Sequence, residues 1–214
     1  MRLRFRGMGG LGLALLVEAF LSGKVLGAST ETLSLRPPMR WVPAWHADPR
    51  PAGSRIRYLI LHDTETPGVS EARVIARHFR NPDSAVSAHF IIGKRGEILQ
   101  CVPEEWRAWH AGESYLDGFD HLNDISLGIE LVNAQTGHDP FPSAQLRSLE
   151  ALLVYLMVRH EVPWSRVLGH RQVTLKPDMK RDPADNFPWA LIGTAVRDQL
   201  ARFEAPDGRA ALTR

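Results

Sequence analysis

The chain has 214 residues, 44% of them hydrophobic and 23% charged, and a formal net charge of +2 at pH 7. This composition excludes a disordered or fibrous protein and favours one globular domain, and a single cysteine excludes a disulfide framework or a cysteine-rich metal site. The first 27 residues carry a net charge of +3, from Arg2, Arg4, Arg6 and Lys24 against Glu18, which leaves a net charge of −1 for the rest of the chain. A near-neutral body of this kind gives no indication of a basic surface that would bind nucleic acid.

The first predicted segment is a secretory signal peptide over residues 1–28. A basic stretch precedes an apolar run at Met8–Val17, and small residues follow at Gly27 and Ala28. The run is shorter than the roughly 20 apolar residues that span a bilayer, so we expect no membrane span in the mature chain. The sequence thus predicts an exported, periplasmic or cell-envelope protein, and no cysteine is present near the cleavage site for lipid attachment. The alternative is an N-terminal tail without a targeting role.

Residues 29–54 are predicted to form an arm without helix or central strand, because prolines recur through them. Trp41 and Trp45 indicate that this arm packs on the domain. The domain itself is predicted over residues 55–203, followed by a polar tail at 204–214. Cys101 ends an apolar, strand-like run and is expected to be a buried hydrophobic residue.

The domain shows strand patterns alternating with helix patterns. Ser70 and Ser143 are expected to open the first two helices as capping residues. The expected strands are Ile56–Leu61, Ala88–Ile92, Glu97–Val102, Ile125–Val132 and Trp164–Leu168, and the expected helices are Ser70–Phe79, Ser143–His160 and Trp189–Phe203. This order predicts an α/β fold, a single domain with a central mixed β-sheet flanked by helices.

Histidines and one aspartate mark a candidate metal site. His62 stands where a buried strand ends, His170 follows another apolar segment, and Asp182 lies twelve residues later. Two imidazoles and a carboxylate suit a divalent ion and leave the fourth position of zinc for water. The position of His62 alone favours a capping or core histidine, and no short motif ties two ligands to one helix.

Further polar residues lie in or near apolar segments. Glu130 interrupts the run Ile125–Val132, where a carboxylate is costly unless it meets a cation or hydrogen-bond donors, although strand alternation allows it to face outward. Lys180 lies in a loop broken by prolines and by itself is typical of a solvated lysine. Trp109 and His110 form a loop that offers an aromatic face and an imidazole to a ligand, or a packed turn.

Six segments in order resemble the zinc-dependent N-acetylmuramoyl-L-alanine amidases of the type 2 class, which share the fold of peptidoglycan recognition proteins. The resemblance covers about residues 55–192. It rests on the segments Leu59–Thr64, Ser87–Ile92, Ala108–Ser114, Leu122–Leu131, Gly169–Arg171 and Lys180–Asp182 with the Pro183 and Phe187–Trp189 that follow.

This resemblance implies one zinc ion per chain, held by His62, His170 and Asp182. It also implies that Glu130 is the catalytic acid and base, that Lys180 stabilises the oxyanion, and that the substrate is peptidoglycan or a muropeptide. Trp109 and His110 are expected to contact this substrate. The implied reaction is hydrolysis of the amide bond between N-acetylmuramic acid and the L-alanine of the stem peptide.

Two features depart from the family pattern. Asp63 follows the first ligand where the family often has an aromatic residue or histidine, and Ala184-Asp185-Asn186 interrupt the loop after Asp182-Pro183. Three other interpretations stay open: a peptidoglycan-binding module without catalysis, a zinc hydrolase that cuts another amide bond, and a secreted structural domain.

Overall fold

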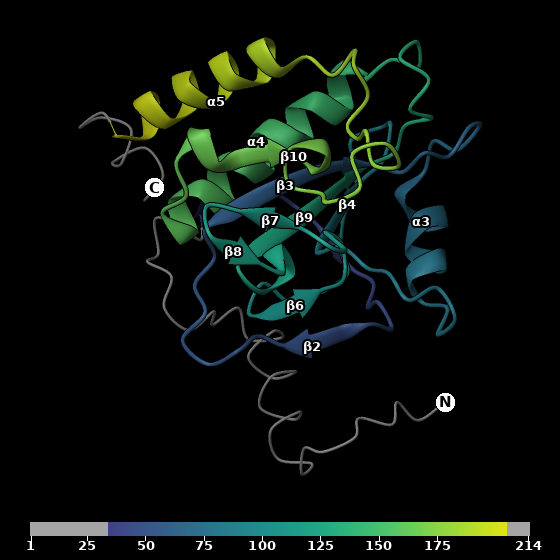
Figure 1. The fold of residues 1–214 in the computed structure, drawn as a ribbon. Coiled ribbons are helices and arrows are strands. Elements are labelled where there is room, and N and C mark those ends of the chain that lie inside the picture. The colour runs from purple at the N-terminus through teal and green to yellow at the C-terminus, as the bar shows by residue number, and fades with distance from the viewer. Residues whose placement is uncertain (1–33, 205–214) are drawn as a thin grey trace.

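The computed structural model describes residues 34–204, so the predicted signal peptide and the end of the chain lie outside the described residues. In the described part a six-stranded sheet runs in the order β1-β5-β4-β9-β3-β10 (Figure 1). All neighbours in it pair in parallel except β4 and β5, so the sheet is mixed as predicted. Its strands are β1 (Arg40–Trp41), β3 (Tyr58–Asp63), β4 (Phe90–Ile92), β5 (Ile98–Gln100), β9 (Ser126–Leu131) and β10 (Val167–Gly169).

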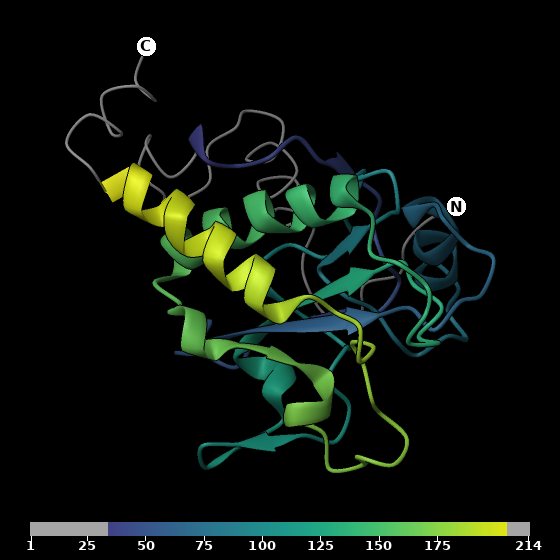
Figure 2. The ribbon, with the colours of Figure 1, turned by 90° about the horizontal axis from the view of Figure 1, so that it is seen from above.

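Helices α4 (Ser143–His160) and α5 (Trp189–Glu204) cover one face of this sheet, with α5 outermost (Figures 1 and 2). Leu59 and Leu61 of β3 and Leu127 of β9 point into the core that these helices bury. Because side chains alternate along a strand, the residues between them face the opposite side. There α3 (Ala72–Phe79) packs over Ile91 and Leu99.

Shorter elements complete that second face. They surround a small core that includes Tyr58, Ile60 and Leu122. The strand pairs β2 (Ala47–Pro49) with β6 (Trp106–Ala108) and β7 (Tyr115–Leu116) with β8 (Phe119–Asp120) are antiparallel. The short 3-10 helices are η1 (Leu122–Asp124), η2 (Trp164–Arg166) and η3 (His170–Gln172).

Most predicted elements are present, with shifted ends. The first strand runs on to Asp63, so His62 lies within it, and the predicted strand Trp164–Leu168 begins only at Val167 after a 3-10 turn. The expected serine caps were wrong: Ser143 is the first residue of α4, and neither helix has a side-chain cap from its own N-cap residue. The free amide of Ala72 instead donates to Glu97 Oε1 at 2.9 Å, so the cap of α3 comes from the neighbouring hairpin.

The proline-rich arm lies on the domain through its backbone. Val42 N donates to Gln100 O and Ala44 N to Cys101 O, and β1 adds an edge strand beside β5. Trp41 and Trp45 stay half exposed, so these tryptophans are not the main anchor. Cys101 is buried, as predicted, and burial raises the pKa of its thiol to about 12. Among the described helices, none combines the length and the apolar character that crossing a membrane requires.

Candidate metal and catalytic site

The candidate site lies where three neighbouring strands end. β3 carries His62 and Asp63, β9 carries Glu130 in register with His62, and His170 begins η3 directly after β10. Because β3, β9 and β10 are parallel, their carboxyl ends meet at one edge of the sheet, where open α/β folds place ligands. His62 and Glu130 share the face opposite α4 and α5, since register partners point the same way.

The structure brings His62, His170 and Asp182 together although 120 residues separate the first and the last. All three are buried, and one ligand atom from each lies within 4.8 Å of the others. Asp182 Oδ2 lies 2.9 Å from His62 Nδ1 and 3.1 Å from His170 Nδ1. Gly169 allows this approach, because a Cβ there would lie 2.7 Å from Pro183 Cδ in the loop that carries Asp182.

The charge states expected for these residues suit the binding of a metal cation. Burial lowers the pKa of His62, which favours a neutral ring. Burial alone would raise the pKa of Asp182, but hydrogen bonds to His170 and His62 hold it below its ordinary value, so the carboxylate stays ionised. Its Oδ1 is buried without a hydrogen-bond partner among the described residues. Two imidazole nitrogens and a carboxylate that converge in this way match the donor set of a divalent ion such as zinc.

Both histidines turn their other ring nitrogen away from this centre. His170 Nε2 lies 3.3 Å from the carbonyl oxygen of Ala111, and His62 Nε2 lies 3.1 Å from His110 Nδ1. Such outer contacts fix the orientation of metal-ligating rings in proteins. Nδ1 is therefore the nitrogen that each ring presents to the centre.

Glu130 lies beside this cluster and forms no salt bridge with any residue that the structure describes. Its side chain is half buried, and Oε2 has no hydrogen-bond partner in the part of the chain that the structure describes. Burial, followed by the negative charges of Asp182 and Asp63, raises the pKa of Glu130 well above its ordinary value. A carboxyl group with a raised pKa can exchange protons near neutral pH, which general acid–base catalysis requires.

The two features that depart from the family pattern, Asp63 and the segment Ala184-Asp185-Asn186, are in contact with each other. Asp63 is buried, and its Oδ2 accepts a hydrogen bond of 2.7 Å from the amide of Ala184. Burial raises the pKa of Asp63 to about 7. The unusual acid therefore holds the start of the unusual Ala184-Asp185-Asn186 segment, and with it the loop that carries Asp182.

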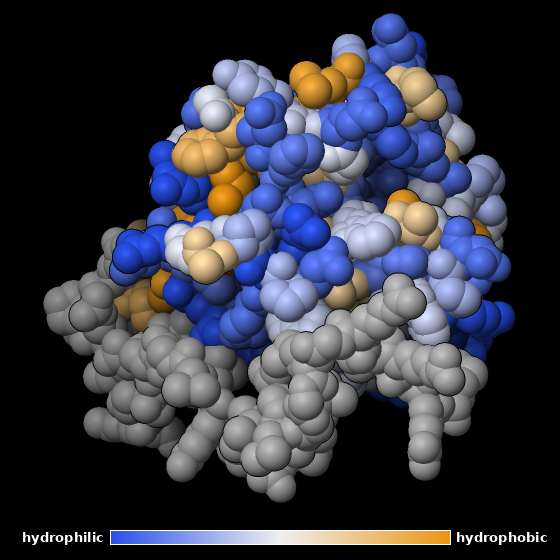
Figure 3. Space-filling model, turned by 60° about the horizontal axis from the view of Figure 1, so that its bottom comes forward, coloured by the Kyte–Doolittle hydropathy of each residue, from blue (hydrophilic) through white to orange (hydrophobic). Residues whose placement is uncertain are grey.

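A cavity of about 460 Å³ opens over the cluster. Its floor includes His62, Glu130 and Asp182, its far wall comes from α3, and Lys180 lies exposed at its edge. A second hollow of about 420 Å³ shares Lys180 and His170 with it. Figure 3 shows a face of the molecule on which hydrophilic residues predominate and apolar side chains form small separate groups.

The predicted substrate residues Trp109 and His110 line both hollows. Trp109 is half buried, stacks on His46 with ring centroids 4.7 Å apart, and donates from Nε1 to Asp48. His110 is buried, and its ring nitrogens lie against Ser126 and His62. Their contact with substrate stays a prediction, as do the catalytic roles of Glu130 and Lys180.

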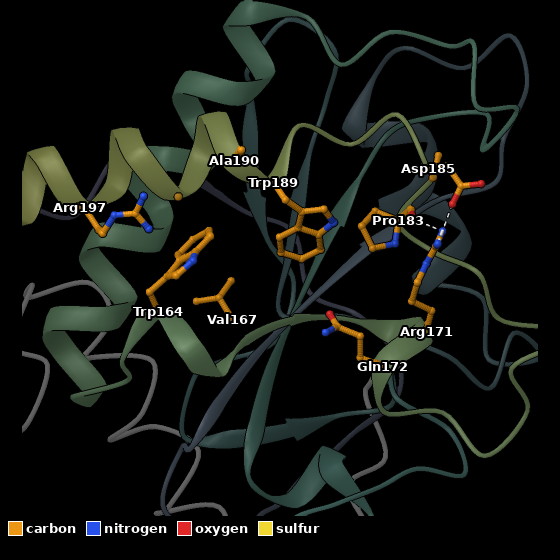
Figure 4. Close-up of a pocket in the computed structure, with 11 residues that line it drawn as sticks. Trp164, Val167, Arg171, Gln172, Pro183, Asp185, Trp189, Ala190 and Arg197 are labelled. Atoms are coloured by element: carbon orange, nitrogen blue, oxygen red, sulfur yellow. Dashed lines mark hydrogen bonds and ion pairs between the residues drawn. The ribbon is translucent and has the colours of Figure 1, made fainter.

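A larger cavity of about 600 Å³ lies elsewhere, between α5, η2 and the loop after Asp182 (Figure 4). Trp164 and Trp189 face it across Val167, and its acid, Asp185, is paired with Arg171 at 2.6 Å. It contains none of the three clustered residues. We therefore assign the chemistry to the smaller cavity.

Sequence reasoning missed the residues that support His110. Ser126 bonds to its ring, and the backbone amides of His110 and Ala111 both donate to Asn123 Oδ1. Gly128 leaves room for the ring, because a Cβ there would lie 2.4 Å from His110 Cγ. The sequence pattern that could have indicated these residues is the alternation of Ser126, Gly128 and Glu130, which lie on one face of the same strand.

Comparisons with known proteins agree with this site. A family model described as N-acetylmuramoyl-L-alanine amidase matches residues 52–185. The 1,6-anhydro-N-acetylmuramyl-L-alanine amidase AmpD of Salmonella typhimurium is 34% identical over 171 residues, 73% of this chain and 89% of the relative. A crystal structure of a selenomethionine derivative of AmpD superposes with a TM-score of 0.67 at 33% identity and covers 76% of this chain and 97% of its own.

A complex of the Escherichia coli amidase AmiD with the substrate anhydro-N-acetylmuramic acid-L-Ala-D-γ-Glu-L-Lys is also similar. Its TM-score is 0.57 at 28% identity, and the match covers 68% of this chain and 60% of that one. These relatives therefore resemble this domain both in sequence and in fold.

Proposed function

The chain belongs to the type 2 family of N-acetylmuramoyl-L-alanine amidases, and we propose that it uses one zinc ion to hydrolyse the amide bond between N-acetylmuramic acid and L-alanine in peptidoglycan fragments. The observation that carries this proposal is the convergence of His62, His170 and Asp182 beside Glu130. A module that only binds peptidoglycan would not need an acid with a raised pKa beside such a cluster.

The ion would be held by His62 Nδ1, His170 Nδ1 and a carboxylate oxygen of Asp182. When bound there, zinc would supply a lowered pKa for a coordinated water, from ~15.7 toward ~7, and would polarise a carbonyl group. Three protein ligands would leave the fourth position of a zinc ion for water.

Glu130 and Lys180 would perform the proton transfers and the charge stabilisation. Glu130 accepts a proton from the attacking water and then delivers it to the departing nitrogen of L-alanine, a double role that its raised pKa permits. Lys180, at the edge of the same cavity, donates hydrogen bonds to the oxyanion that forms from the carbonyl oxygen. Trp109, which lines both hollows, offers a ring face to the sugar or the stem peptide.

Soluble 1,6-anhydro muropeptides are the substrates that the relatives suggest. AmpD is named for the 1,6-anhydro sugar, and the AmiD complex contains an anhydro-muramyl tripeptide. The predicted leader, residues 1–28, would export this chain to the periplasm or the cell envelope. Sequencing the N-terminus of the secreted protein tests the leader separately.

Digestion of a defined anhydro-muramyl tetrapeptide tests the reaction. Mass spectrometry should find an intact stem peptide that begins with L-alanine, together with the free anhydro sugar, and no products after zinc removal. A cut inside the stem would show a different amide hydrolase. Zinc-loaded protein that binds the fragment and releases nothing would show a binding module.

A further inference from the structure

The two histidines of the cluster differ in what their outer nitrogens meet. When a metal ion occupies the centre, Nδ1 of each ring must be bare, and His170 then donates from Nε2 to the carbonyl oxygen of Ala111. His62 Nε2 instead faces the ring of His110, which can donate or accept from Nδ1. The proton position on His62 therefore depends on His110.

A chain of hydrogen bonds removes this ambiguity. Ser126 Oγ lies against the carbonyl oxygen of Leu122, so its only hydrogen is donated there. Ser126 Oγ must then accept from His110 Nε2, which lies 3.3 Å away. A neutral His110 that carries its proton on Nε2 has a bare Nδ1, and this nitrogen lies 3.1 Å from His62 Nε2.

The end of the chain is the metal cluster. With a metal ion between Nδ1 and Asp182, His62 donates from Nε2 to the bare nitrogen of His110 and keeps its lone pair on Nδ1, the nitrogen that lies 2.9 Å from Asp182 Oδ2. Metal ligation requires this neutral form with its lone pair turned inward. A backbone carbonyl, fixed by the fold, thus sets the proton position of His62 through two side chains.

The ring of His110 is held in place for this contact. Asn123 Oδ1 accepts from the amides of His110 and Ala111 at 3.0 and 2.8 Å, which fixes the loop. Gly128 lies under the ring and offers no Cβ to displace it.

We propose that His110 is a positioning residue that holds His62 in its Nε2–H tautomer and so prepares Nδ1 for the metal. The proposal rests on the zinc site of the proposed function. Partners that orient a metal-ligating histidine typically change metal affinity by about 10- to 100-fold when they are removed. We expect a loss of that size when the acceptor on His110 is removed.

The test compares zinc affinity, measured by competition with a chromogenic chelator, in His110→Phe and His110→Asn. Phenylalanine fills the space without an acceptor, whereas asparagine places an amide oxygen near the position of Nδ1. We expect about 10- to 100-fold weaker zinc binding for His110→Phe and restoration to within a few-fold for His110→Asn. Unchanged affinity in His110→Phe, or an equal loss in both variants, would overturn the proposal.

His89→Phe is the matched control for packing, because His89 is also a buried imidazole and its ring centroid lies 5.6 Å from that of His110, but its nitrogens bond to Gly128 N, Trp106 O and Arg50 and not to His62. Its zinc affinity should stay within about threefold of the unmodified protein. If His89→Phe lost as much zinc affinity as His110→Phe, the packing of the rings alone would explain both losses, and this result would contradict the proposed role of the contact between His110 and His62.

The unmodified zinc-loaded protein gives a readout that needs no variant. Nitrogen-15 correlation spectra of the histidine rings should show His110 and His62 each protonated on Nε2 only. A proton on His110 Nδ1 would refute the chain of hydrogen bonds. If the unmodified protein binds no zinc at all, the proposed function fails. If it binds zinc tightly and the His110 variants bind zinc with the same affinity, only the positioning role of His110 is refuted.

Discussion

Replacing Glu130 by glutamine separates proton transfer from folding and from metal binding. Glutamine keeps the size of the side chain but cannot exchange a proton. General acid–base groups typically contribute about 10²- to 10⁴-fold to the rate. At 1.36 kcal/mol for each factor of ten, this corresponds to about 3–5 kcal/mol of barrier.

The surroundings of Glu130 indicate that the protein will tolerate this change. Oε2 has no hydrogen-bond partner in the described chain, so its replacement breaks no bond there. Asp182 and Asp63 both raise the pKa of Glu130 by charge repulsion, and a neutral amide relieves that repulsion. We therefore expect an unchanged or higher melting temperature and an unchanged zinc content, because Glu130 lies outside the group formed by His62, His170 and Asp182.

The assay is release of the stem peptide from an anhydro-muropeptide, followed by mass spectrometry, with zinc content measured on the same sample. Glu97→Gln is a matched control, because Glu97 is also a half-buried acid with an unpartnered Oε2 in the described part of the chain, but it caps α3 outside the cavity. This control should keep full activity. A Glu130→Gln protein that is fully loaded with zinc and retains more than a tenth of the activity would refute the proposed role of Glu130.

Three further outcomes are expected. Lys180→Ala should lower turnover by about 10²- to 10³-fold with zinc content unchanged, while the adjacent Arg181→Ala has little effect; equal losses would contradict a role for Lys180 in the cavity. Chelation should abolish activity, and zinc at 100 times its Kd should add about 2.7 kcal/mol of stability, or about 5–10 °C in calorimetry; an unchanged melting temperature would contradict a structured metal site. Burial alone would raise the pKa of Glu104, but His160 and Arg159 hold it below 4.5. Its stabilising effect is therefore present above pH 4.5 and lost as the pH falls through the folded value, so urea unfolding at a series of pH values should show an acid loss that Glu104→Gln reduces.

Local sequence patterns predicted the helices and strands whose formation depends on interactions between residues close in the sequence. The helix Ser143–His160 has the bounds that its sequence predicts, because apolar residues recur at helical spacing over its whole length. The cap of α3 was not predictable in this way. Ser70 precedes the helix, but the hydrogen bond to Ala72 comes from Glu97, which only the packing of the hairpin brings there.

The sequence by itself determined which segments form the buried strands, though not where each strand ends, and the order of six short motifs was enough to indicate the family and the candidate residues of its site. Hydrophobic alternation is a property of neighbouring residues, so it placed His62 and Glu130 on or near strands without any knowledge of the fold. What only the tertiary structure decided is which polar atoms meet. Asp182 comes from a loop without periodicity, Asp63 holds Ala184 across 121 residues, and His110 turns toward His62 because Ser126 and Gly128 lie behind it. Buried polar groups must find partners, and the choice of partner depends on which distant segments the core brings into contact.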